Sequence, residues 1–377
     1  MKIIHIIPSL GIGGTEKILD LITEKLKAHE HIIINLGNSG YIERSLKKRN
    51  HKIKKIKFNY YNFPISLLKI LIFLRKENPE IIQSWLYKAD LITIFIRLIL
   101  NHKNIIWNIR GTKIQDFWKL DKKLCLWLLS KFSKFVPSRI ICCGKKAMDE
   151  HISIGYPINK MIIIENGIDT EKYICNLTKN NYLREKLSIK KQKLILGCIG
   201  RYEYLKGLDN LIKGLNLIYE KNKSKIAIVL AGKEINKNNK RINNLIQETK
   251  NSLQFILLDE IHDVPQILQG LDFYCSPSRY EGFPNIIAEA MSAGIPCIVS
   301  DAGDSERIVG DAGICYGPST PQNIAFGINK FLELNSNERI ELGISSRNRI
   351  KENFYLKKMC NKYEKLYLSI SHADQKS

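Results

Sequence analysis

The residues from Ser278 to Ser300 restrict the fold of this chain more than any other stretch. A short apolar run, Leu271–Cys275, precedes them and a second, Cys297–Ser300, ends them, and each has the length and composition of a buried strand. Between the two runs, Pro284 favours extended backbone before it, and Ile286–Ala293 has a helical pattern. The pattern predicts a strand, loop, helix and strand of a parallel α/β sheet, with the loop at the edge where such sheets bind ligands.

The start of this predicted helix is typical of an anion site. With Asn285 as the expected N-cap, the backbone N–H groups of Asn285, Ile286 and Ile287 are free to bind a phosphate at the positive end of the helix dipole. Glu281 lies just before the helix and Glu289 one turn into it, so we expect the two carboxylates on opposite sides of the anion. Carboxylates there accept hydrogen bonds from hydroxyl groups, which suggests a sugar nucleotide. Equally, they could only complement the dipole or face solvent.

The run Glu281-Gly-Phe-Pro-Asn-Ile-Ile-Ala-Glu289-Ala-Met-x-x-Gly-x-Pro resembles the signature of glycosyltransferase family 4. That family contains retaining transferases with the two-domain GT-B fold. The resemblance implies an α/β fold with two Rossmann-like domains that face each other across a cleft. It also implies that Glu281 contacts hydroxyls of the donor sugar, that Glu289 contacts the ribose, and that the amides of Phe283, Asn285 and Ile286 contact the diphosphate.

A second match to this family follows the predicted strand Lys193–Ile199. Gly200-Arg201 and Lys206-Gly207 lie between this strand and the next helix, and they resemble the pair of cations that neutralises the donor diphosphate. Arg201 offers a planar fork and Lys206 a point charge, which suits a leaving group that gains negative charge. The catalytic residues that we predict are Arg201, Lys206 and Glu281.

The first turn of the chain is rich in glycine. Lys2–Pro8 is predicted to be a strand, and Gly11-Ile-Gly13-Gly14 leads into an amphipathic helix that ends near Leu26. The third glycine of the dinucleotide fingerprint is missing, so the loop alone is weak support for such a cofactor. The resemblance assigns Gly13 and Gly14 to the donor phosphates and the acceptor; the alternative is a tight turn without a ligand.

Arg110 ends the predicted strand Ile105–Ile109. Many family members carry a histidine at the end of such a strand, beside the reacting sugar. A fixed cation is no proton acceptor, and it is better suited to hold a phosphate of the acceptor or of the donor.

The length of 377 residues suits two domains. The run Asn166–Asp169 resembles the family's domain junction, and the polar run Asn176–Asn181 is typical of a linker. We predict an N-terminal acceptor-binding Rossmann-like domain at residues 1–175 and a C-terminal nucleotide-sugar-binding Rossmann-like domain at residues 176–352. Residues 353–377 are predicted to form a helix that crosses back to the first domain, with a frayed tail from His372.

Composition and the lengths of the apolar runs limit the class of protein and its expected location. Hydrophobic residues make up 44% of the chain, which excludes a disordered protein. The nine cysteines include no Cys-x-x-Cys pair, which favours a reduced, cytoplasmic protein. The apolar run at the N-terminus is too short for a signal peptide, and no run is long enough to span a membrane. Because the chain contains no Asp-x-Asp, we expect no metal ion at the diphosphate, in keeping with the metal-independent pattern of the family it resembles. We expect no cofactor, since the sugar nucleotide is a substrate.

Aromatic and basic residues alternate between Lys113 and Lys146. The apolar members are Phe117, Trp118, Leu124, Trp127, Leu128, Phe132 and Phe135, and the basic ones include Lys119, Lys122, Lys123, Lys131, Lys134 and Arg139. Such helices either rest on an anionic membrane surface or pack into the core with a solvated lysine face. The pattern leaves both possibilities open.

The sequence thus predicts a retaining, metal-independent glycosyltransferase. Its donor would be a UDP-, GDP- or ADP-sugar. Its acceptor would be a glycan or a lipid-linked glycan of lipopolysaccharide, O-antigen or capsule, at the inner face of the plasma membrane. A soluble transferase that acts on a small sugar or a protein is the first alternative.

Two other classes fit less well. A dinucleotide-dependent enzyme would use the glycine-rich loop, but no acidic residue pairs clearly with that loop to hold a ribose. A nucleic-acid-binding protein would use the net charge of +22, but the basic residues are spread over the chain and no reading motif occurs. We therefore expect no nucleic-acid partner.

Overall fold

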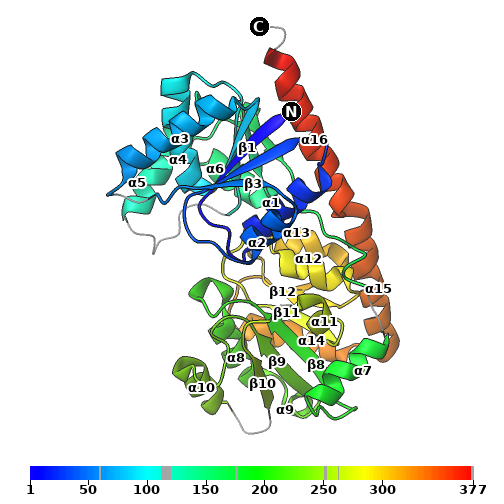
Figure 1. The fold of residues 1–377 in the computed structure, drawn as a ribbon. Coiled ribbons are helices and arrows are strands. Elements are labelled where there is room, and N and C mark those ends of the chain that lie inside the picture. The colour runs from blue at the N-terminus through cyan, green and yellow to red at the C-terminus, as the bar shows by residue number, and fades with distance from the viewer. Residues whose placement is uncertain (59–60, 112–119, 175–176, 250–252, 262, 375–377) are drawn as a thin grey trace. The chain divides into compact units, whose positions relative to one another are not determined.

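The structure is a computed structural model that describes residues 1–58, 61–111, 120–174, 177–249, 253–261 and 263–374 (Figure 1). The chain forms two compact units. Unit 1 consists of Met1–Gly167 together with Lys357–Ser377, and unit 2 consists of Ile168–Leu356. The predicted domain boundary between residues 175 and 176 falls outside the described residues.

Unit 1 is built on a parallel sheet of seven strands in the order β3-β2-β1-β4-β5-β6-β7. The strands are β1 (Lys2–Ile7), β2 (Glu30–Asn35), β3 (Lys52–Lys55), β4 (Ile81–Trp85), β5 (Ile105–Ile109), β6 (Arg139–Cys142) and β7 (Met161–Ile163). β4 and β5 are buried along their whole length and rich in isoleucine, as expected for a parallel sheet covered on both faces. The strand order reverses beside β1, which makes the carboxyl ends of β1 and β4 the expected ligand edge.

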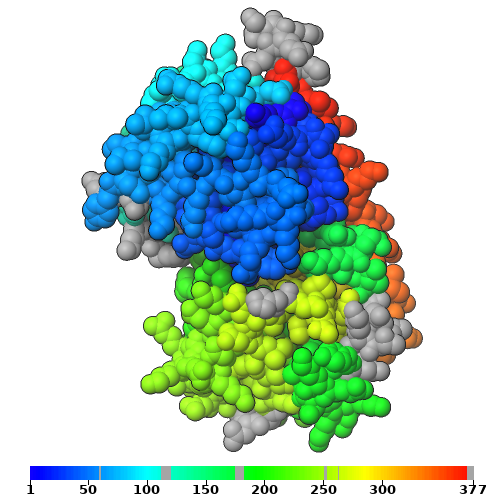
Figure 2. All heavy atoms as spheres, viewed as in Figure 1, coloured from blue at the N-terminus to red at the C-terminus, as the bar shows by residue number. Residues whose placement is uncertain are grey.

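Helices also belong to the described part of unit 1. They are α1 (Gly14–Lys25), α2 (Tyr41–Lys48), α3 (Phe63–Glu77), α4 (Leu86–Leu100), α5 (Leu120–Phe132), α6 (Lys145–Ile152), the 3-10 turn η1 (Ile158–Lys160) and α16 (Leu356–Asp374). α4 packs against β4 and β5 and also touches α3 and α5, so these three helices form one layer (Figure 1). Figure 2 shows a face of unit 1 made mainly of the blue and light-blue residues of the first part of the chain.

The C-terminal helix α16 is integrated into unit 1 by buried aromatic side chains. Tyr363 and Tyr367 are fully buried. The side-chain amide of Asn108 donates to the Tyr363 hydroxyl at 2.9 Å, and the Tyr367 hydroxyl donates to Gln83 Oε1 at 2.5 Å. These bonds satisfy polar atoms of β4 and β5 that would otherwise be costly to bury.

Unit 2 is built on a parallel sheet of six strands in the order β10-β9-β8-β11-β12-β13. The strands are β8 (Leu194–Ile199), β9 (Ile226–Ala231), β10 (Gln254–Leu258), β11 (Phe273–Ser276), β12 (Cys297–Val299) and β13 (Ile314–Cys315). Here the order reverses between β8 and β11. The loops that follow these two strands therefore meet at the carboxyl edge of the sheet.

The helical segments of unit 2 are α7 (Leu177–Lys186), η2 (Tyr204–Lys206), α8 (Leu208–Leu217), α9 (Glu220–Lys223), α10 (Lys240–Gln247), α11 (Val264–Leu268), α12 (Asn285–Ser292), α13 (Ser305–Val309), η3 (Gly310–Ala312), α14 (Pro321–Glu333) and α15 (Ser336–Asn353). The core lies between the sheet and these helices. Within it the rings of Phe273 and Phe331 stack with centroids 4.4 Å apart. The predicted strand, loop, helix and strand correspond to β11, α12 and β12, which confirms that prediction.

One prediction about local structure is wrong, and one predicted helix start is displaced. Residues 177–181 belong to helix α7 and not to a linker. Leu183 on the same helix is buried and packs beside Gly270, so tertiary contact outweighs the polar composition of the run. The predicted last helix is present as α16, but it begins three residues later than residue 353, at Leu356, because α15 ends at Asn353. α16 continues through His372 to Asp374, beyond the predicted start of a frayed tail, and residues 375–377 lie outside the described part of the chain.

The eight cysteines in the described part of the chain are all free thiols. Within the described ranges, none of the helices combines the length and the apolar character that a membrane span requires.

Candidate functional site

A small cavity lies where the loops after β8 and β11 meet the start of α12. Among its lining residues are Gly200 and Arg201 after β8, Lys206 in η2, Ser278 and Glu281 after β11, and Ile286 in the first turn of α12. The topology of unit 2 explains this arrangement, since β8 and β11 are neighbours at the point where the strand order reverses. Of the predicted site residues, Arg201, Lys206, Glu281 and Ile286 are brought together here.

Lys206 and Glu281 form the central ion pair of the cavity. Lys206 Nζ lies 2.6 Å from Glu281 Oε1, and the Ser278 hydroxyl donates to the same oxygen at 2.7 Å. The Glu281 side chain is only 12% exposed, and that of Lys206 is 30% exposed. The pair places one cation and one hydrogen-bond acceptor side by side, which suits a ligand that carries both a phosphate and hydroxyl groups.

Arg201 lies at the rim of the cavity with most of its side chain in solvent. Its Nη1 is 2.8 Å from Glu203 Oε1, and both side chains are exposed. Such an exposed pair contributes little to stability, so the guanidinium can exchange its partner for an anionic ligand at low cost.

Helix α12 begins one residue earlier than predicted. Pro284 occupies the N-cap position, with φ −75° and ψ 89°, and makes no side-chain capping bond, so the prediction of Asn285 as the N-cap is wrong. Proline takes this position because its backbone angle already fits a helix start and it has no N–H to satisfy. The prediction of a free Ile287 amide is also wrong, because this N–H donates to the Pro284 carbonyl at 3.1 Å. The amides of Asn285 and Ile286 lie in the first helical turn, where intrahelical acceptors are lacking.

Glu289 does not line this cavity within the described part of unit 2. Its carboxylate is buried and accepts a hydrogen bond from the Tyr173 hydroxyl. Burial, together with the Glu289 charge, raises the pKa of Tyr173 and keeps this hydroxyl as a donor. Phe283 is also buried, with its ring 5.7 Å from that of Phe354.

Several residues of this region were not predicted. Ser278 and Tyr173 each bond a predicted carboxylate, and Arg279 bonds Asp209 through both of its Nη atoms at 2.7 Å. A signal existed only for Ser278 and Arg279, which lie within three residues of Glu281 in the sequence. Tyr173 and Asp209 lie far from their partners in sequence, so only the fold identifies them.

The glycine-rich loop of unit 1 lies at the expected ligand edge of its sheet. Gly13 is the N-cap of α1, and its carbonyl accepts the Lys17 amide at 3.0 Å. The Ser9 hydroxyl donates to Glu16 Oε1 at 2.8 Å across the loop. Gly14 is the first residue of the helix, so the two glycines expose backbone rather than side chains at the end of β1.

Arg110 follows β5 at the same edge of the unit 1 sheet. One of its Nη atoms donates to Asn166 Oδ1, and its guanidinium lies over the Trp85 ring at 5.8 Å from the centroid. The other atom, Nη1, is buried without a hydrogen-bond partner among the described residues. A buried donor of this kind is costly to leave unpaired, and it can bind an acceptor atom of a ligand.

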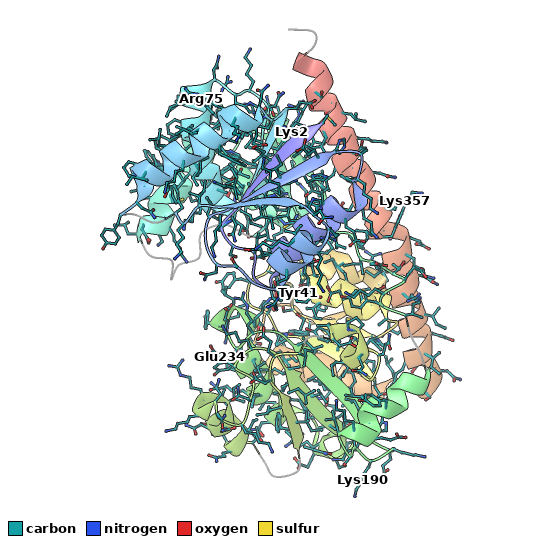
Figure 3. The ribbon with its side chains drawn as sticks, viewed as in Figure 1. Lys2, Tyr41, Arg75, Lys190, Glu234 and Lys357 are labelled. Atoms are coloured by element: carbon teal, nitrogen blue, oxygen red, sulfur yellow. The ribbon has the colours of Figure 1, made fainter. Side chains whose placement is uncertain are left out.

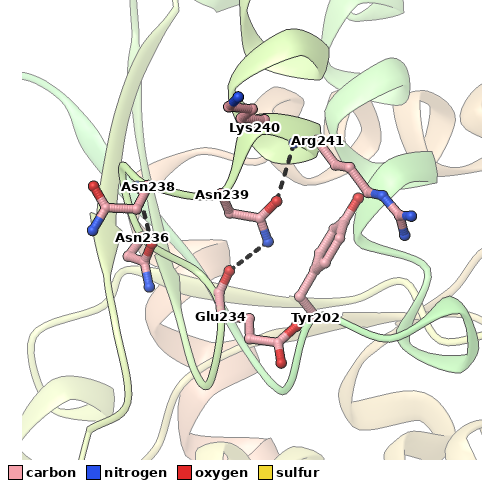
Figure 4. A pocket seen from close by; sticks show the side chains of 7 residues that line it. All are labelled: Tyr202, Glu234, Asn236, Asn238, Asn239, Lys240 and Arg241. Atoms are coloured by element: carbon pink, nitrogen blue, oxygen red, sulfur yellow. Dashed lines mark hydrogen bonds between the residues drawn. The ribbon is translucent and has the colours of Figure 1, made fainter.

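A wider cavity of about 410 Å³ lies beside Tyr202 and the start of α10 (Figure 4). The Asn239 side chain donates to the Glu234 carbonyl at 2.8 Å and accepts from the Arg241 amide at 3.1 Å, while Asn236 accepts from the Asn238 amide. These bonds hold the loop that leads into α10. The cavity contains none of the predicted site residues.

Among the described residues, no group of three or more His, Cys, Asp and Glu side chains is arranged to hold a metal ion. The chemistry that the cavity of unit 2 offers is that of Lys206, Arg201, Glu281 and the first amides of α12. It combines two cations, a helix start and a carboxylate, which together suit an anion bound to a polyol.

Two Rossmann-like units, each with its ligand edge at a reversal of strand order, define the GT-B class of glycosyltransferases. Comparison with known families agrees with this class. Residues 12–172 match the model for Glycosyltransferase Family 4, and residues 180–356 match the model for Glycosyl transferases group 1. The chain therefore belongs to the glycosyltransferases that these two models describe, one in each half of the chain. This confirms the predicted resemblance and the predicted fold class.

Individual relatives are distant. The chain is 25% identical to the capsular polysaccharide biosynthesis glycosyltransferase CapM of Staphylococcus aureus over 80% of each chain. It is 24% identical to the UDP-Gal:alpha-D-GlcNAc-diphosphoundecaprenol alpha-1,3-galactosyltransferase of Escherichia coli, over 65% of this chain and 63% of that protein. Among solved structures, Anabaena Alr3699/HepE, solved in complex with UDP and with UDP-glucose, has the same fold. Its TM-score is 0.85 at 18% identity, and the match covers 98% of this chain and all of that one.

Proposed function

We propose that this protein is a retaining, metal-independent glycosyltransferase that moves a sugar from a nucleoside diphosphate sugar to a hydroxyl of a lipid-linked glycan. The observation that carries the proposal is the cavity after β8 and β11, where Arg201, Lys206 and Glu281 gather at the start of α12. Two loops that are separate in sequence supply the two cations and the carboxylate that such a donor requires.

Lys206, Arg201 and the first amides of α12 stabilise the diphosphate as it leaves. Negative charge grows on the diphosphate when the bond to the anomeric carbon breaks, so fixed cations stabilise the transition state more than the ground state. Glu281 accepts hydrogen bonds from hydroxyls of the donor sugar and so orients it. Glu289, fixed by Tyr173, has the role of binding the ribose, and the amides of Phe283, Asn285 and Ile286 bind the diphosphate.

The donor with the best support is a UDP-sugar. The E. coli relative is named for UDP-Gal, and HepE is solved with UDP and with UDP-glucose. The residues of the cavity bind the diphosphate and the sugar, which UDP-, GDP- and ADP-sugars share. Activity measured with a panel of UDP-, GDP- and ADP-sugars is therefore needed to identify the nucleotide base of the donor.

The proposed acceptor is a lipid-linked glycan in the assembly of capsule, O-antigen or lipopolysaccharide. The relatives support this class, because CapM is named for capsular polysaccharide biosynthesis and the E. coli enzyme for a diphosphoundecaprenol acceptor. Gly13, Gly14 and Arg110 are the proposed contacts of unit 1 with phosphates of donor or acceptor. Nη1 of Arg110, which is buried and has no hydrogen-bond partner in the described part of the chain, supports its part in this role.

A lipid-linked acceptor requires the enzyme to work at a membrane surface, and unit 1 has a face that suits peripheral contact. A groove of about 710 Å³ lies along β3 and α3 and is lined by Lys52, Lys54, Lys55, Lys57, Lys69 and Lys76. The apolar side chains Ile65 and Ile72 of the same groove are more than half exposed. Figure 3 labels Arg75, near the C-terminal end of α3.

Helix α5 adds exposed apolar side chains to the proposed membrane face. Leu124 and Trp127 are more than half exposed, and Phe135 beyond the helix is 74% exposed. Core packing, the alternative for this stretch, does not explain these three side chains. Phe117, Trp118 and Lys119 of the predicted stretch lie outside the described residues. Basic side chains beside exposed apolar ones are typical of peripheral contact with anionic lipid, here at the inner face of the plasma membrane.

Release of nucleoside diphosphate in the presence of EDTA tests the donor and the absence of a metal requirement. We expect turnover with one sugar nucleotide of the UDP, GDP and ADP panel, and loss of about 10²-fold or more in Lys206→Ala. Glu341→Ala, which removes an exposed carboxylate on α15, is the matched control. Turnover that appears only when a divalent metal is added would contradict the metal-independent part of the proposal.

The stereochemistry is tested separately by the anomeric coupling constant of the product in proton NMR. Retention predicts the same anomeric configuration as in the donor. An inverted product would exclude the retaining mechanism while leaving the donor site intact.

Co-sedimentation with vesicles tests the membrane contact. We expect binding to vesicles that contain phosphatidylglycerol and not to pure phosphatidylcholine, with strong dependence on salt. The double variant Lys57→Glu, Lys69→Glu should lose binding. The double variant Lys190→Glu, Lys237→Glu carries the same change of charge in unit 2 and should keep it. Equal binding by both variants would exclude the groove as the contact.

A further inference from the structure

Arg279 joins the two loops that carry Lys206 and Glu281. Its Nη1 and Nη2 atoms donate to the two carboxylate oxygens of Asp209, each at 2.7 Å. Nη1 also donates to the Tyr204 carbonyl at 2.8 Å, and the guanidinium lies over the Tyr204 ring at 4.3 Å from its centroid. One side chain after β11 thus bonds three groups of the segment after β8.

The backbones of the two loops are joined at the same place. The amide of Arg279 donates to the Leu205 carbonyl at 2.8 Å, and the amide of Tyr280 donates to the same oxygen at 3.4 Å. Leu205 immediately precedes Lys206, and Tyr280 immediately precedes Glu281. The bonds therefore set the distance between the two residues whose side chains form the 2.6 Å ion pair.

The Arg279 guanidinium does not line the cavity, and its bonds are directed at the protein. Its side chain is 15% exposed and that of Asp209 is 33% exposed. Although burial alone would raise the pKa of Asp209, the hydrogen bonds and charge of Arg279 lower it, so the carboxylate stays ionised. A planar guanidinium bonded to both carboxylate oxygens has a defined orientation that a lysine could not supply.

We infer that Arg279 and Asp209 are positioning residues that hold Lys206 against Glu281 for the transfer reaction. The inference rests on the proposed function of this cavity. Lys206 and Glu281 have long side chains on different loops, and they face each other only while the loops are held in place. A displacement of about 1 Å at reacting groups costs on the order of 10²-fold in rate, so a pair that prevents it affects turnover without touching the donor.

The test uses Arg279→Gln, Asp209→Asn and the double variant in the full chain. We expect each single variant to lower kcat at least tenfold, with a smaller change in KM, because alignment is lost. The double variant should be no worse than either single one, since the two residues act as a unit. Arg279→Lys should restore little of the rate, because it lacks the planar fork.

Arg184→Gln is the matched control. Arg184 donates to Asp272 at 2.9 Å and to two backbone carbonyls, and its side chain is 13% exposed, so it is a comparable ion pair of the same unit outside the cavity. It should lower the melting temperature, because its bonds are lost, and leave kcat within about twofold, because none of these bonds lies at the cavity. If Arg279→Gln lowers the melting temperature like the control and leaves kcat unchanged, the pair is structural only and the inference fails.

Hydrogen exchange of the free protein tests the same inference without any substrate. The amides of Lys206 and Gly207 donate to Glu203 and Tyr204 carbonyls at 2.9 and 3.2 Å. Arg279→Gln should raise their exchange rates about tenfold, while Arg184→Gln should not. Unchanged exchange would overturn the inference. If Arg279→Gln raises exchange but Lys206→Ala keeps full donor turnover, the positioning holds and the proposed role of the cavity fails.

Discussion

Replacing Gly207 with alanine should move Lys206 away from Glu281, its ion-pair partner in the cavity. Gly207 follows Lys206 and has a positive backbone φ of 64°. A Cβ there would lie less than 3.0 Å from both the carbonyl oxygen and the carbonyl carbon of Pro277, in the loop that leads to Glu281. The backbone of the two loops has to separate, because neither of these atoms belongs to a flexible side chain.

Two costs follow from this change. The left-handed backbone costs an alanine about 1–2 kcal/mol of folding stability. The overlap adds a shift of about 1 Å between the loops, which should lower kcat on the order of 10²-fold. Turnover of the sugar nucleotide and unfolding in urea measure the two effects separately.

Gly317→Ala is the control that introduces the backbone strain of a positive φ without displacing the two loops. Gly317 also lies in unit 2 and has a positive φ of 81°, but a Cβ there would meet nothing within 4 Å. It should therefore lose a similar 1–2 kcal/mol and keep kcat within about threefold of the wild type. If Gly207→Ala also keeps its kcat within that range, the contact between the two loops does not set the geometry of the site.

The remaining predictions concern buried polar groups and the donor site. In unit 1, Trp85 donates to His5 Nδ1, His5 bonds His31 Nδ1 at 3.0 Å, and His31 bonds the Leu26 carbonyl, so neither ring has room for a second proton. Burial, and then neighbouring histidines, hold the pKa of His5 well below 6.5; burial lowers that of His31 to about 4. Because the fold favours neutral rings, their stabilisation is complete above about pH 6.5 and is lost as the pH falls towards 4. Urea unfolding should therefore give a stability about 2 kcal/mol lower at pH 5 than at pH 7 from His31 alone, and His31→Gln should flatten the profile. Burial raises the pKa of Asp90 well above its ordinary value, although Ser84 donates to it at 2.5 Å. The fold favours the neutral acid, so this stability is present at low pH and lost as the pH rises. Asp90→Asn should therefore stabilise the protein at pH 7 and lose that advantage in acid; an equal effect at both pH values would contradict the assignment. Tyr173→Phe should weaken donor binding about 5- to 10-fold by removing the bond to Glu289, and an unchanged Kd by calorimetry would remove Glu289 from the donor site.

The sequence predicts which residues of the loops after β8 and β11 bind the donor, because each set of residues lies close together in the chain. Gly200, Arg201 and Lys206 follow a strand pattern and precede a helix pattern, and Glu281 lies in a motif of its own, so each loop could be located alone. The parallel sheet then brings the loops after β8 and β11 together, as expected for the carboxyl edge.

The bonds between those loops could not be predicted. Arg279 and Asp209 lie far apart in sequence, and their pairing depends on the adjacency of β8 and β11. The start of α12 was misassigned by one residue, because asparagine is a good N-cap in general while Pro284 takes that position here. The polar run Asn176–Asn181 predicts a linker, and it gives no sign of the contact that Leu183 of helix α7 makes with Gly270.

The most direct test of the central claim is a calorimetric titration of the protein with UDP-, GDP- and ADP-sugars in the presence of EDTA. We expect one donor to bind to the wild type and to Glu341→Ala with the same Kd. Glu281→Ala, which removes the carboxylate beside Lys206, should weaken that binding about tenfold or more. Equal affinity of Glu281→Ala and wild type for the donor would contradict the account, because the cavity after β8 and β11 would then not be the sugar-nucleotide site.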